Sequence, residues 1–259
     1  MVCNSGTSLV PTVDGRTHHF YHVGIHDALF VMQDAETKTL WNHITGEAVY
    51  GPLVGRSIGP ISNLLHMTVK QALAMDPATR VAISDQMYFA GGRRFGTVSR
   101  GPRAGGSGNG EGARLGPSPD NPNAAMTDRF AATLGKEDLR RPRMDMGLGV
   151  WTGTTSRYYA IDRIRARGEA FLDRIDGRTV LIYVEAVSNT PAALFVNARS
   201  ARREGRGVRL DDGSRVESGV LTDRTGGRQP VERPQQMFTR WYGFSLTFPG
   251  CEVFGDEQR

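Results

Sequence analysis

Residues 17–55 read THHFYHVGIHDALFVMQDAETKTLWNHITGEAVYGPLVG, and this stretch decides the class of fold. Aromatic and β-branched residues gather at 17–23, 28–33 and 48–50, which favours three short strands. Gly24 separates the first two strands, and Gly51-Pro52 follows the third, because glycine and proline interrupt strands. The stretch therefore predicts short strands, with the first change of direction at Gly24.

The rest of the chain mixes helical and strand patterns. A helix is predicted for 62–76, with Ser62 as its N-cap and Pro77 after its end. A second helix is predicted for 158–172, and the apolar run TVLIYV at 179–184 is typical of a buried strand. The aromatic residues at 238–248 are interpreted as core packing. Together these patterns predict a β-rich α+β fold.

Composition excludes several classes of function. The chain has 259 residues, enough for one large domain or two small ones. Its net charge of +5 is carried almost wholly by arginines that are interleaved with Asp and Glu, a pattern typical of a solvated surface. No run approaches the roughly 18 apolar residues that span a bilayer. We therefore expect no nucleic-acid partner and no transmembrane segment.

A Gly- and Pro-rich stretch divides the chain into three predicted segments. These are a first half at 1–90, a linker at 91–145, and a second half at 146–259. The linker has too little apolar surface to offset the entropy of ordering it. Weak matches run in order through the two halves, with Gly55 matching Gly227 and Pro77 matching Pro249 at one common spacing. The pattern predicts two degenerate tandem halves that superpose.

The tandem pattern predicts that an element is missing from the first half. In the second half, the helix at 158–172 and the strand at 179–184 precede the segment that matches Cys3. The first half has no counterpart before Met1, so either that element was lost or the chain begins inside a longer gene product, and we expect the second. The longer product is expected to be extracytoplasmic. If Met1 is the true start, the protein is expected in the cytoplasm, because no secretory signal follows Met1.

Three short segments carry a family resemblance. DAETKTLW at 34–41, TGEA at 45–48 and GPLVG at 51–55 resemble the signature of the bacterial and archaeal domain-of-unknown-function family 3179. Members of that family read D-x-E-T-x-S-x-W, T-G-E-A and G-P-L-x-G, and Thr39 replaces the usual serine here. Four later residues resemble the closing segment of the family, namely Trp241, Phe244, Pro249 and Glu252.

The resemblance implies a thiol site at Cys3. In that family a strand ends in a C-x-x-C-like motif, and some members carry selenocysteine. Cys3 would be the second member of the motif, and the first would fall immediately before Met1. A turn at 4–7 can present backbone N–H groups to a thiolate. The alternative is that Cys3 is a small buried hydrophobe, since a lone thiol cannot form an intramolecular disulfide.

Metal binding is predicted from the histidines, all six of which lie within the first 66 residues. A reversal at Gly24 would bring His22 and His26 to opposite sides of a hairpin, with His43 or Cys3 as a third ligand. Nitrogen and sulfur ligands suit Zn or Cu. On an uninterrupted strand, residues four apart lie about 13 Å from each other, too far to share an ion. The alternative is a set of half-exposed strand histidines.

Asp34 and Glu47 are candidate catalytic residues because both lie near Trp41 in the sequence. A carboxylate beside an indole is expected to have a raised pKa and to act as a general acid or base. The alternative is that 45–47 is a turn in which Glu47 holds a backbone N–H, while Trp41 fills the core.

Two functions follow from these residues. The first is a thiol-redox or metal-binding protein centred on Cys3 and the N-terminal histidine cluster, acting with an unidentified small molecule or redox partner. The second is a non-enzymatic binding or assembly module in which the signature at 34–55 is structural.

Overall fold

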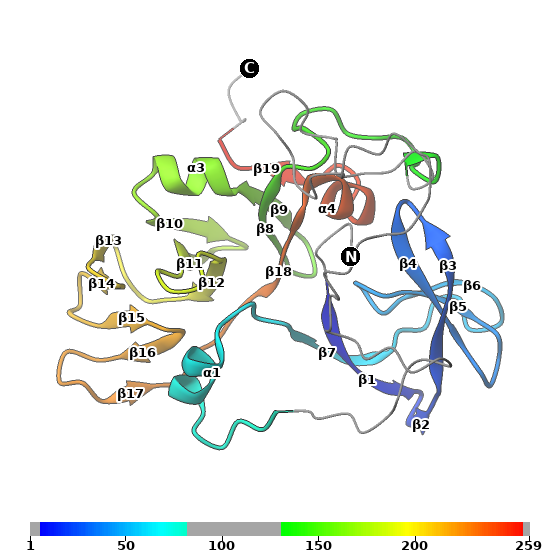
Figure 1. The fold of residues 1–259 in the computed structure, drawn as a ribbon, viewed down its shortest axis with the longest axis horizontal. Helices are drawn as coiled ribbons and strands as arrows, with labels where there is room; N and C mark the ends of the chain where they lie inside the picture. Colours follow the sequence, from blue (N-terminus) through cyan, green and yellow to red (C-terminus); the bar gives the residue numbers. More distant parts are fainter. Residues whose placement is uncertain (1–5, 82–130, 256–259) are drawn as a thin grey trace, which may run out of the picture.

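A computed structural model describes residues 6–81 and 131–255, and it confirms a β-rich α+β protein (Figure 1). The strands within these ranges fall into five small sheets. Their pairings are antiparallel except for one parallel pair, β19 with β9. No helix in the described ranges is long and apolar enough to cross a membrane.

The first part of the chain forms two sheets, drawn in blue to cyan in Figure 1. In one sheet β1 (Thr7–Val13) lies between β2 (Arg16–Thr17) and β7 (Gly59–Asn63). The other is a meander of β3 (Phe20–His26), β4 (Leu29–Asp34), β5 (Leu40–Asn42) and β6 (Ala48–Tyr50). The strands predicted at 28–33 and 48–50 are thus confirmed.

The predicted change of direction at Gly24 was wrong. Strand β3 continues through Gly24, and the chain reverses at Asp27 and Ala28, which both have positive φ, 52° and 53°. Positive φ at both central residues is the geometry of the tight turn that matches the twist of a hairpin. Gly24 instead lies at a bulge, where the register against β4 shifts between His22 and Gly24.

Both predicted helices are shorter than expected. α1 is Val69–Met75, and its N-cap is Thr68 rather than Ser62, because Thr68 and Gln71 form a reciprocal capping box. The second predicted helix contains only α3 (Ile161–Ala166), which stands between β9 (Ser156–Ala160) and β10 (Ala170–Ile175). Strand pairing takes both ends of the second predicted helix, whereas in the first β7 takes only Ser62 and Asn63 and the capping box at Thr68 sets the start of α1.

The second part of the chain forms three sheets around the predicted buried strand. The run at 179–184 lies in β11 (Arg178–Val184), between β10 and β12 (Pro191–Phe195). A meander follows, with β13 (Ala201–Glu204), β14 (Gly207–Leu210), β15 (Arg215–Glu217), β16 (Val220–Thr222) and β17 (Arg228–Gln229). The last sheet contains β18 (Gln235–Arg240), β8 (Met146–Trp151), β9 and β19 (Glu252–Val253).

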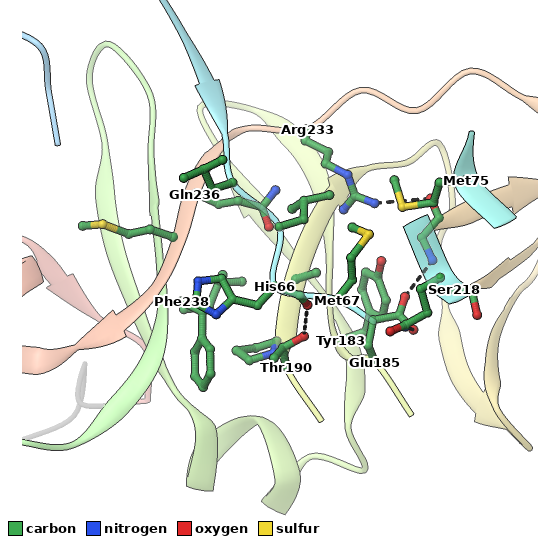
Figure 2. A pocket seen from close by; sticks show the side chains of 18 residues that line it. His66, Met67, Met75, Tyr183, Glu185, Thr190, Ser218, Arg233, Gln236 and Phe238 are labelled. Atoms are coloured by element: carbon green, nitrogen blue, oxygen red, sulfur yellow. Dashed lines mark hydrogen bonds between the residues drawn. The ribbon is translucent and has the colours of Figure 1, made fainter. Parts of the chain in front are cut away.

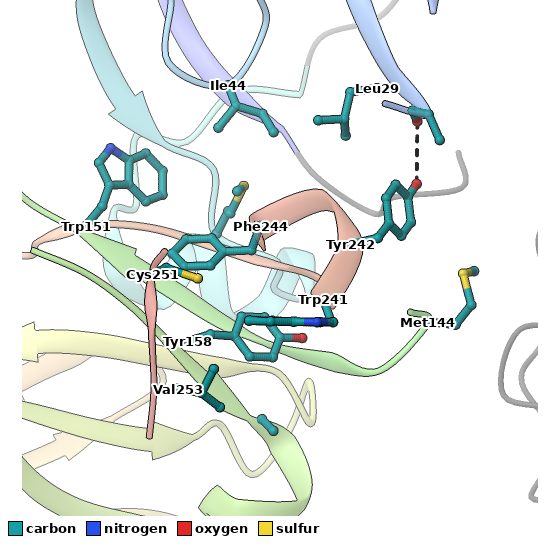
Figure 3. Close-up of a cluster of buried hydrophobic side chains, with 13 residues drawn as sticks. Leu29, Ile44, Met144, Trp151, Tyr158, Trp241, Tyr242, Phe244, Cys251 and Val253 are labelled. Carbon is teal, nitrogen blue, oxygen red and sulfur yellow. Dashed lines mark hydrogen bonds between the residues drawn. The ribbon is translucent and has the colours of Figure 1, made fainter. Parts of the chain in front are cut away.

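One buried cluster joins the two parts of the chain (Figure 3). Leu29 and Ile44 come from the first meander, and Trp241 and Phe244 come from α4 (Trp241–Thr247). The prediction that the aromatic residues at 238–248 form core is confirmed, since Trp241 and Phe244 are fully buried.

The predicted linker contributes to this cluster where the structure describes it. Met144 is buried in the shared core, and Thr133 accepts a hydrogen bond from the Asp27 N–H through its carbonyl oxygen. Residues 82–130 lie outside the described ranges. The segment boundaries at 90 and 145 stay predictions.

The close approach of α4 to β8 generates a stability prediction. A Cβ added at Gly149 would lie 2.2 Å from the Phe244 ring, so Gly149→Ala must displace a fully buried aromatic. We expect the free energy of unfolding to fall by about 1–3 kcal/mol, the usual cost of overpacking a core. Urea denaturation measures this change.

Gly153→Ala is the matched control. An added Cβ there meets nothing within 4 Å. The unfolding midpoint of this variant should stay close to that of the unmodified protein. Equal losses in the two variants would contradict the described packing of Phe244 on β8.

Candidate metal centre

The signature segment is organised by the buried carboxylate of Asp34, at the end of β4. This carboxylate accepts hydrogen bonds from the Trp41 indole N–H at 2.8 Å and from the Thr37 N–H and hydroxyl. Thr37 Oγ1 also lies 2.6 Å from Thr39 Oγ1. Asp34 has no exposed surface, and these donors replace the water it loses. The carboxylate thus ties the turn at 34–39 to the core residue Trp41.

The environment of Asp34 favours its charged form. Burial by itself raises the pKa of Asp34, but hydrogen bonds from Thr37 and Trp41, with a smaller contribution from His18, outweigh burial and lower it. The direction is opposite to the raised pKa expected for a carboxylate beside an indole. Asp34 is therefore ionised at neutral pH and has no proton to give as a general acid.

Glu47 lies in a surface turn. Its carboxylate accepts from the Thr45 hydroxyl at 3.1 Å, and its N–H donates to Thr45 Oγ1. The side chain of Asn42, rather than that of Glu47, holds the N–H groups of Ile44 and Thr45. Trp41 fills the core beneath, with no exposed surface. This geometry favours the turn interpretation of the Thr-Gly-Glu segment.

The described ranges do not bring the predicted metal ligands together. His22 and His26 lie on the same strand, four residues apart, about 13 Å at the usual rise of a strand. His22 packs edge-on against Phe30, while His26 is exposed beside Asp27. Because the chain reverses after His26, the hairpin arrangement predicted for these two histidines was wrong. Cys3 lies outside the described ranges.

His43 is held by the backbone of β4. Its Nδ1 lies 2.8 Å from the Phe30 carbonyl oxygen. Burial lowers the pKa of His43, and the hydrogen bond to Phe30 opposes that shift only in part. The imidazole is therefore neutral, and its Nδ1–H donates to the backbone.

A different set of side chains does converge. His18, Asp34 and Glu36 each offer a ligand atom, and these three atoms lie within 4.8 Å of one another; among the described residues this is the group with metal-ligand spacing. His18 Nδ1 lies 3.7 Å from Asp34 Oδ1 and 3.6 Å from Glu36 Oε2. His18 is only 7% exposed, and its buried Nδ1 makes no hydrogen bond.

Neighbouring groups fix Glu36 in this arrangement. The His19 N–H donates to both carboxylate oxygens of Glu36, and His19 Nδ1 lies 2.7 Å from Oε1. The side-chain and backbone hydrogen bonds from His19 lower the pKa of Glu36. Two ionised carboxylates therefore face one buried imidazole nitrogen.

Sequence reasoning missed His18 and Glu36 because it sought nitrogen and sulfur ligands on a hairpin at Gly24. Pairing the two predicted strands in their correct register would have indicated both residues. Strand β3 pairs Phe20 with Asp34, so the residue two before Phe20 lies near the residue two after Asp34. Histidine at 18 and the Asp-x-Glu pair at 34–36 thus meet where the hairpin opens.

The comparisons with known proteins add no function. The chain matches no family model, and no curated protein or solved structure is significantly similar to it.

The lowered pKa of Asp34 generates a pH-dependent prediction. The carboxylate contributes stability above pH 3.8, the ordinary value for the unfolded chain, and this contribution is lost as pH falls through the lower folded pKa. At neutral pH, Asp34→Asn leaves donors without an acceptor, so it should lower the free energy of unfolding by about 1–3 kcal/mol. The difference from the unmodified protein should shrink below about pH 4.

Urea titrations at several pH values measure this difference. Glu47→Gln is the matched control, and its exposed side chain should change stability by less than about 0.5 kcal/mol at any pH. A difference between Asp34→Asn and the unmodified protein that stays constant from neutral to acid pH would contradict the assignment of a lowered pKa.

Proposed function

We propose that this protein binds a divalent metal ion, Zn²⁺, through His18, Asp34 and Glu36. The observation that carries the proposal is the buried His18 Nδ1, which makes no hydrogen bond and faces two carboxylates at 3.6 and 3.7 Å. A buried polar atom without a partner is rare and costly, and an ion ligated at this nitrogen removes the cost. The predicted metal-binding function is thus kept, with different ligands.

The separations suit a zinc site. Bonds of about 2.0–2.2 Å in tetrahedral geometry place neighbouring ligand atoms about 3.3–3.6 Å apart. The distances from His18 Nδ1 to the two carboxylate oxygens, 3.7 and 3.6 Å, reach this range after a movement of at most a few tenths of an ångström. A half-exposed Glu36 can make that movement more easily than the clamped Asp34 can.

The ligand set favours Zn²⁺ over a soft ion. One imidazole and two carboxylates supply nitrogen and oxygen donors, without sulfur. Three protein ligands leave a fourth tetrahedral position for water or another small ligand, which is the arrangement of zinc sites that do chemistry. The hydrogen bonds from Trp41 and Thr37 to the Asp34 carboxylate would orient Asp34 as a metal ligand.

A structural ion pair is the competing explanation for the same three residues. In that case the His18 imidazole interacts with Asp34 and Glu36 directly, without an ion. The distances of 3.6 and 3.7 Å from His18 Nδ1 to the carboxylate oxygens exceed that of a hydrogen bond, so no hydrogen bond joins the imidazole to either carboxylate. A metal ion between these atoms would account for both the long distances and the missing hydrogen bond.

The thiol-redox function stays a separate proposal, because Cys3 lies outside the described ranges. Cys251 does not supply it. Burial is the main cause that raises the pKa of Cys251 to about 11, so this thiol is protonated at neutral pH and a poor nucleophile. The alternative of a binding module is supported by the hydrogen bond between Asp34 and Trp41, which stabilises the fold. This alternative is compatible with a metal ion bound beside Asp34.

We also propose that the two halves descend from a tandem duplication, with the first half matching the family named above. The order of elements supports the repeat. The first half has β1, β2, a meander of four strands, β7 and α1. The second half, after the segment from β8 to β11, has β12, a meander of five strands, β18 and α4. The pairing differs: β1 pairs with β7 directly, whereas the Gln236 side chain on β18 bonds both the N–H and the carbonyl of Ala193 on β12.

Isothermal titration with Zn²⁺ tests the metal proposal. The unmodified protein, stripped with chelator, should bind one equivalent with a Kd of roughly 10 μM or tighter. Binding should weaken on acidification, because protons compete for the imidazole nitrogen. The tryptophan fluorescence of the protein should change in step, since the Trp41 indole donates a hydrogen bond to the ligand Asp34.

His18→Gln should weaken Zn²⁺ binding at least about tenfold. His22→Gln is the matched control, an exposed histidine of the adjacent strand outside the group, and should bind like the unmodified protein. If the unmodified protein does not bind Zn²⁺, or if His18→Gln binds it as well as His22→Gln does, the metal proposal fails and the three residues form a structural ion pair.

A further inference from the structure

An open cleft lies between the first meander and α4, where the two parts of the chain meet (Figure 1). Its volume is about 470 Å³, within the range of about 300–1,000 Å³ that is typical of small-molecule sites. By contrast, the cavity between α1, β11 and β18 encloses only about 30 Å³, which has room for about two waters (Figure 2). The open cleft, unlike that cavity, can take a small organic molecule.

Apolar side chains form most of the lining of this cleft. Two of them are aromatic, Phe30 of β4 and Tyr50 of β6. Because aromatic pairs are stabilised beyond the area that they bury, this lining favours an aromatic ligand over an aliphatic one of the same size. The aliphatic residues of the lining are Leu29 and Val31 of β4, Leu40 of β5, Val49 of β6 and Leu246 of α4.

A β-bulge in β6 turns two consecutive side chains toward the cleft. Leu40 pairs with Tyr50, and the next residue of β5, Trp41, pairs with Ala48. Val49 therefore has no opposite residue on β5, and bulges of this kind re-aim side chains. Val49 and Tyr50 both line the cleft, and they are 54% and 71% exposed. A bound apolar group would remove part of this exposed surface from water.

The Asp27 carboxylate contributes a negative charge to the lining, from the turn between β3 and β4. One of its oxygens accepts from the Gly135 N–H at 2.7 Å, and the other lies 3.1 Å from His26 Nδ1. The His26 side chain is 80% exposed, so it can turn aside for a ligand. The Asp27 side chain is only 19% exposed, and salt screens the charge of such a partly buried group much less than that of an exposed one.

Charge complementarity selects the head group of the ligand. The described residues that line the cleft include the Asp27 carboxylate and no Lys or Arg. An ammonium group would therefore be attracted to the lining, whereas a carboxylate would be repelled by Asp27. We propose that the cleft binds an aromatic primary amine, with its ring between Tyr50 and Leu246 and its ammonium group at Asp27. The inference is independent of the metal proposal.

Calorimetric titration with three indole probes tests the charge requirement. On the same two-carbon arm, tryptamine carries an ammonium group, tryptophol a neutral hydroxyl and indole-3-propionate a carboxylate. Tryptamine should bind with a Kd of about 1 mM or tighter, tryptophol at least about threefold more weakly, and indole-3-propionate at least about tenfold more weakly. If tryptamine does not bind, or if either analogue binds as tightly as tryptamine does, the proposal fails.

Asp27→Asn tests the carboxylate itself. This variant should keep its Tm, because Asn can also accept from the Gly135 N–H and tolerates the positive φ of 52° at position 27. Its affinity for tryptamine should fall at least about threefold, to that for tryptophol, while its affinity for tryptophol stays unchanged. An Asp27→Asn protein that still binds tryptamine more tightly than tryptophol would contradict the proposal.

Tyr50→Ser tests the apolar wall separately. Because Tyr50 is largely exposed, its Tm should change by less than about 2 °C, while tryptamine binding should weaken at least about fivefold. Tyr21→Ser is the matched control. Tyr21 is an exposed tyrosine in the same row of opposite residues across the sheet, but it lies outside the cleft, so this variant should bind tryptamine as the unmodified protein does. Equal tryptamine affinities in the two variants would overturn the proposal.

Discussion

The hydrogen bond between the Trp41 indole and the buried Asp34 carboxylate is the interaction on which the first part of the structure depends. It joins a tight turn between β4 and β5 to the centre of a small core. A buried charge is tolerated only when donors surround it, and here Thr37 supplies the rest. Once Asp34 is fixed, Glu36 lies two residues farther along and comes to face His18.

The two parts of the chain depend on each other for burial. The first meander shares its burial with the second part of the chain, because α4 supplies Trp241 and Phe244 to a core that also contains Leu29 and Ile44. At another junction, the Gln71 side chain of α1 donates a hydrogen bond to the buried Glu185 carboxylate, just after the end of β11. The two parts of the chain therefore also meet through a buried hydrogen bond.

Hydrogen-bond satisfaction separates scaffold from candidate site. Asp34, Tyr158 and Tyr159 are buried polar residues whose side chains are bonded, and they stabilise turns and strand junctions. Within the described ranges, the buried His18 Nδ1 makes no hydrogen bond and faces two carboxylates. It therefore marks a place where a bound ion would lower the free energy of the folded protein.

The sequence by itself determined the β-rich class, the aromatic core at 238–248, and the strands at 28–33, 48–50 and 179–184. These features follow from alternation, β-branching and apolar runs, which act between neighbouring residues. Tertiary structure alone decided whether Gly24 was a turn or a bulge, and where the helices ended. It also decided that His18 meets Glu36. These outcomes depend on register and on contacts between distant segments, which local preference does not encode.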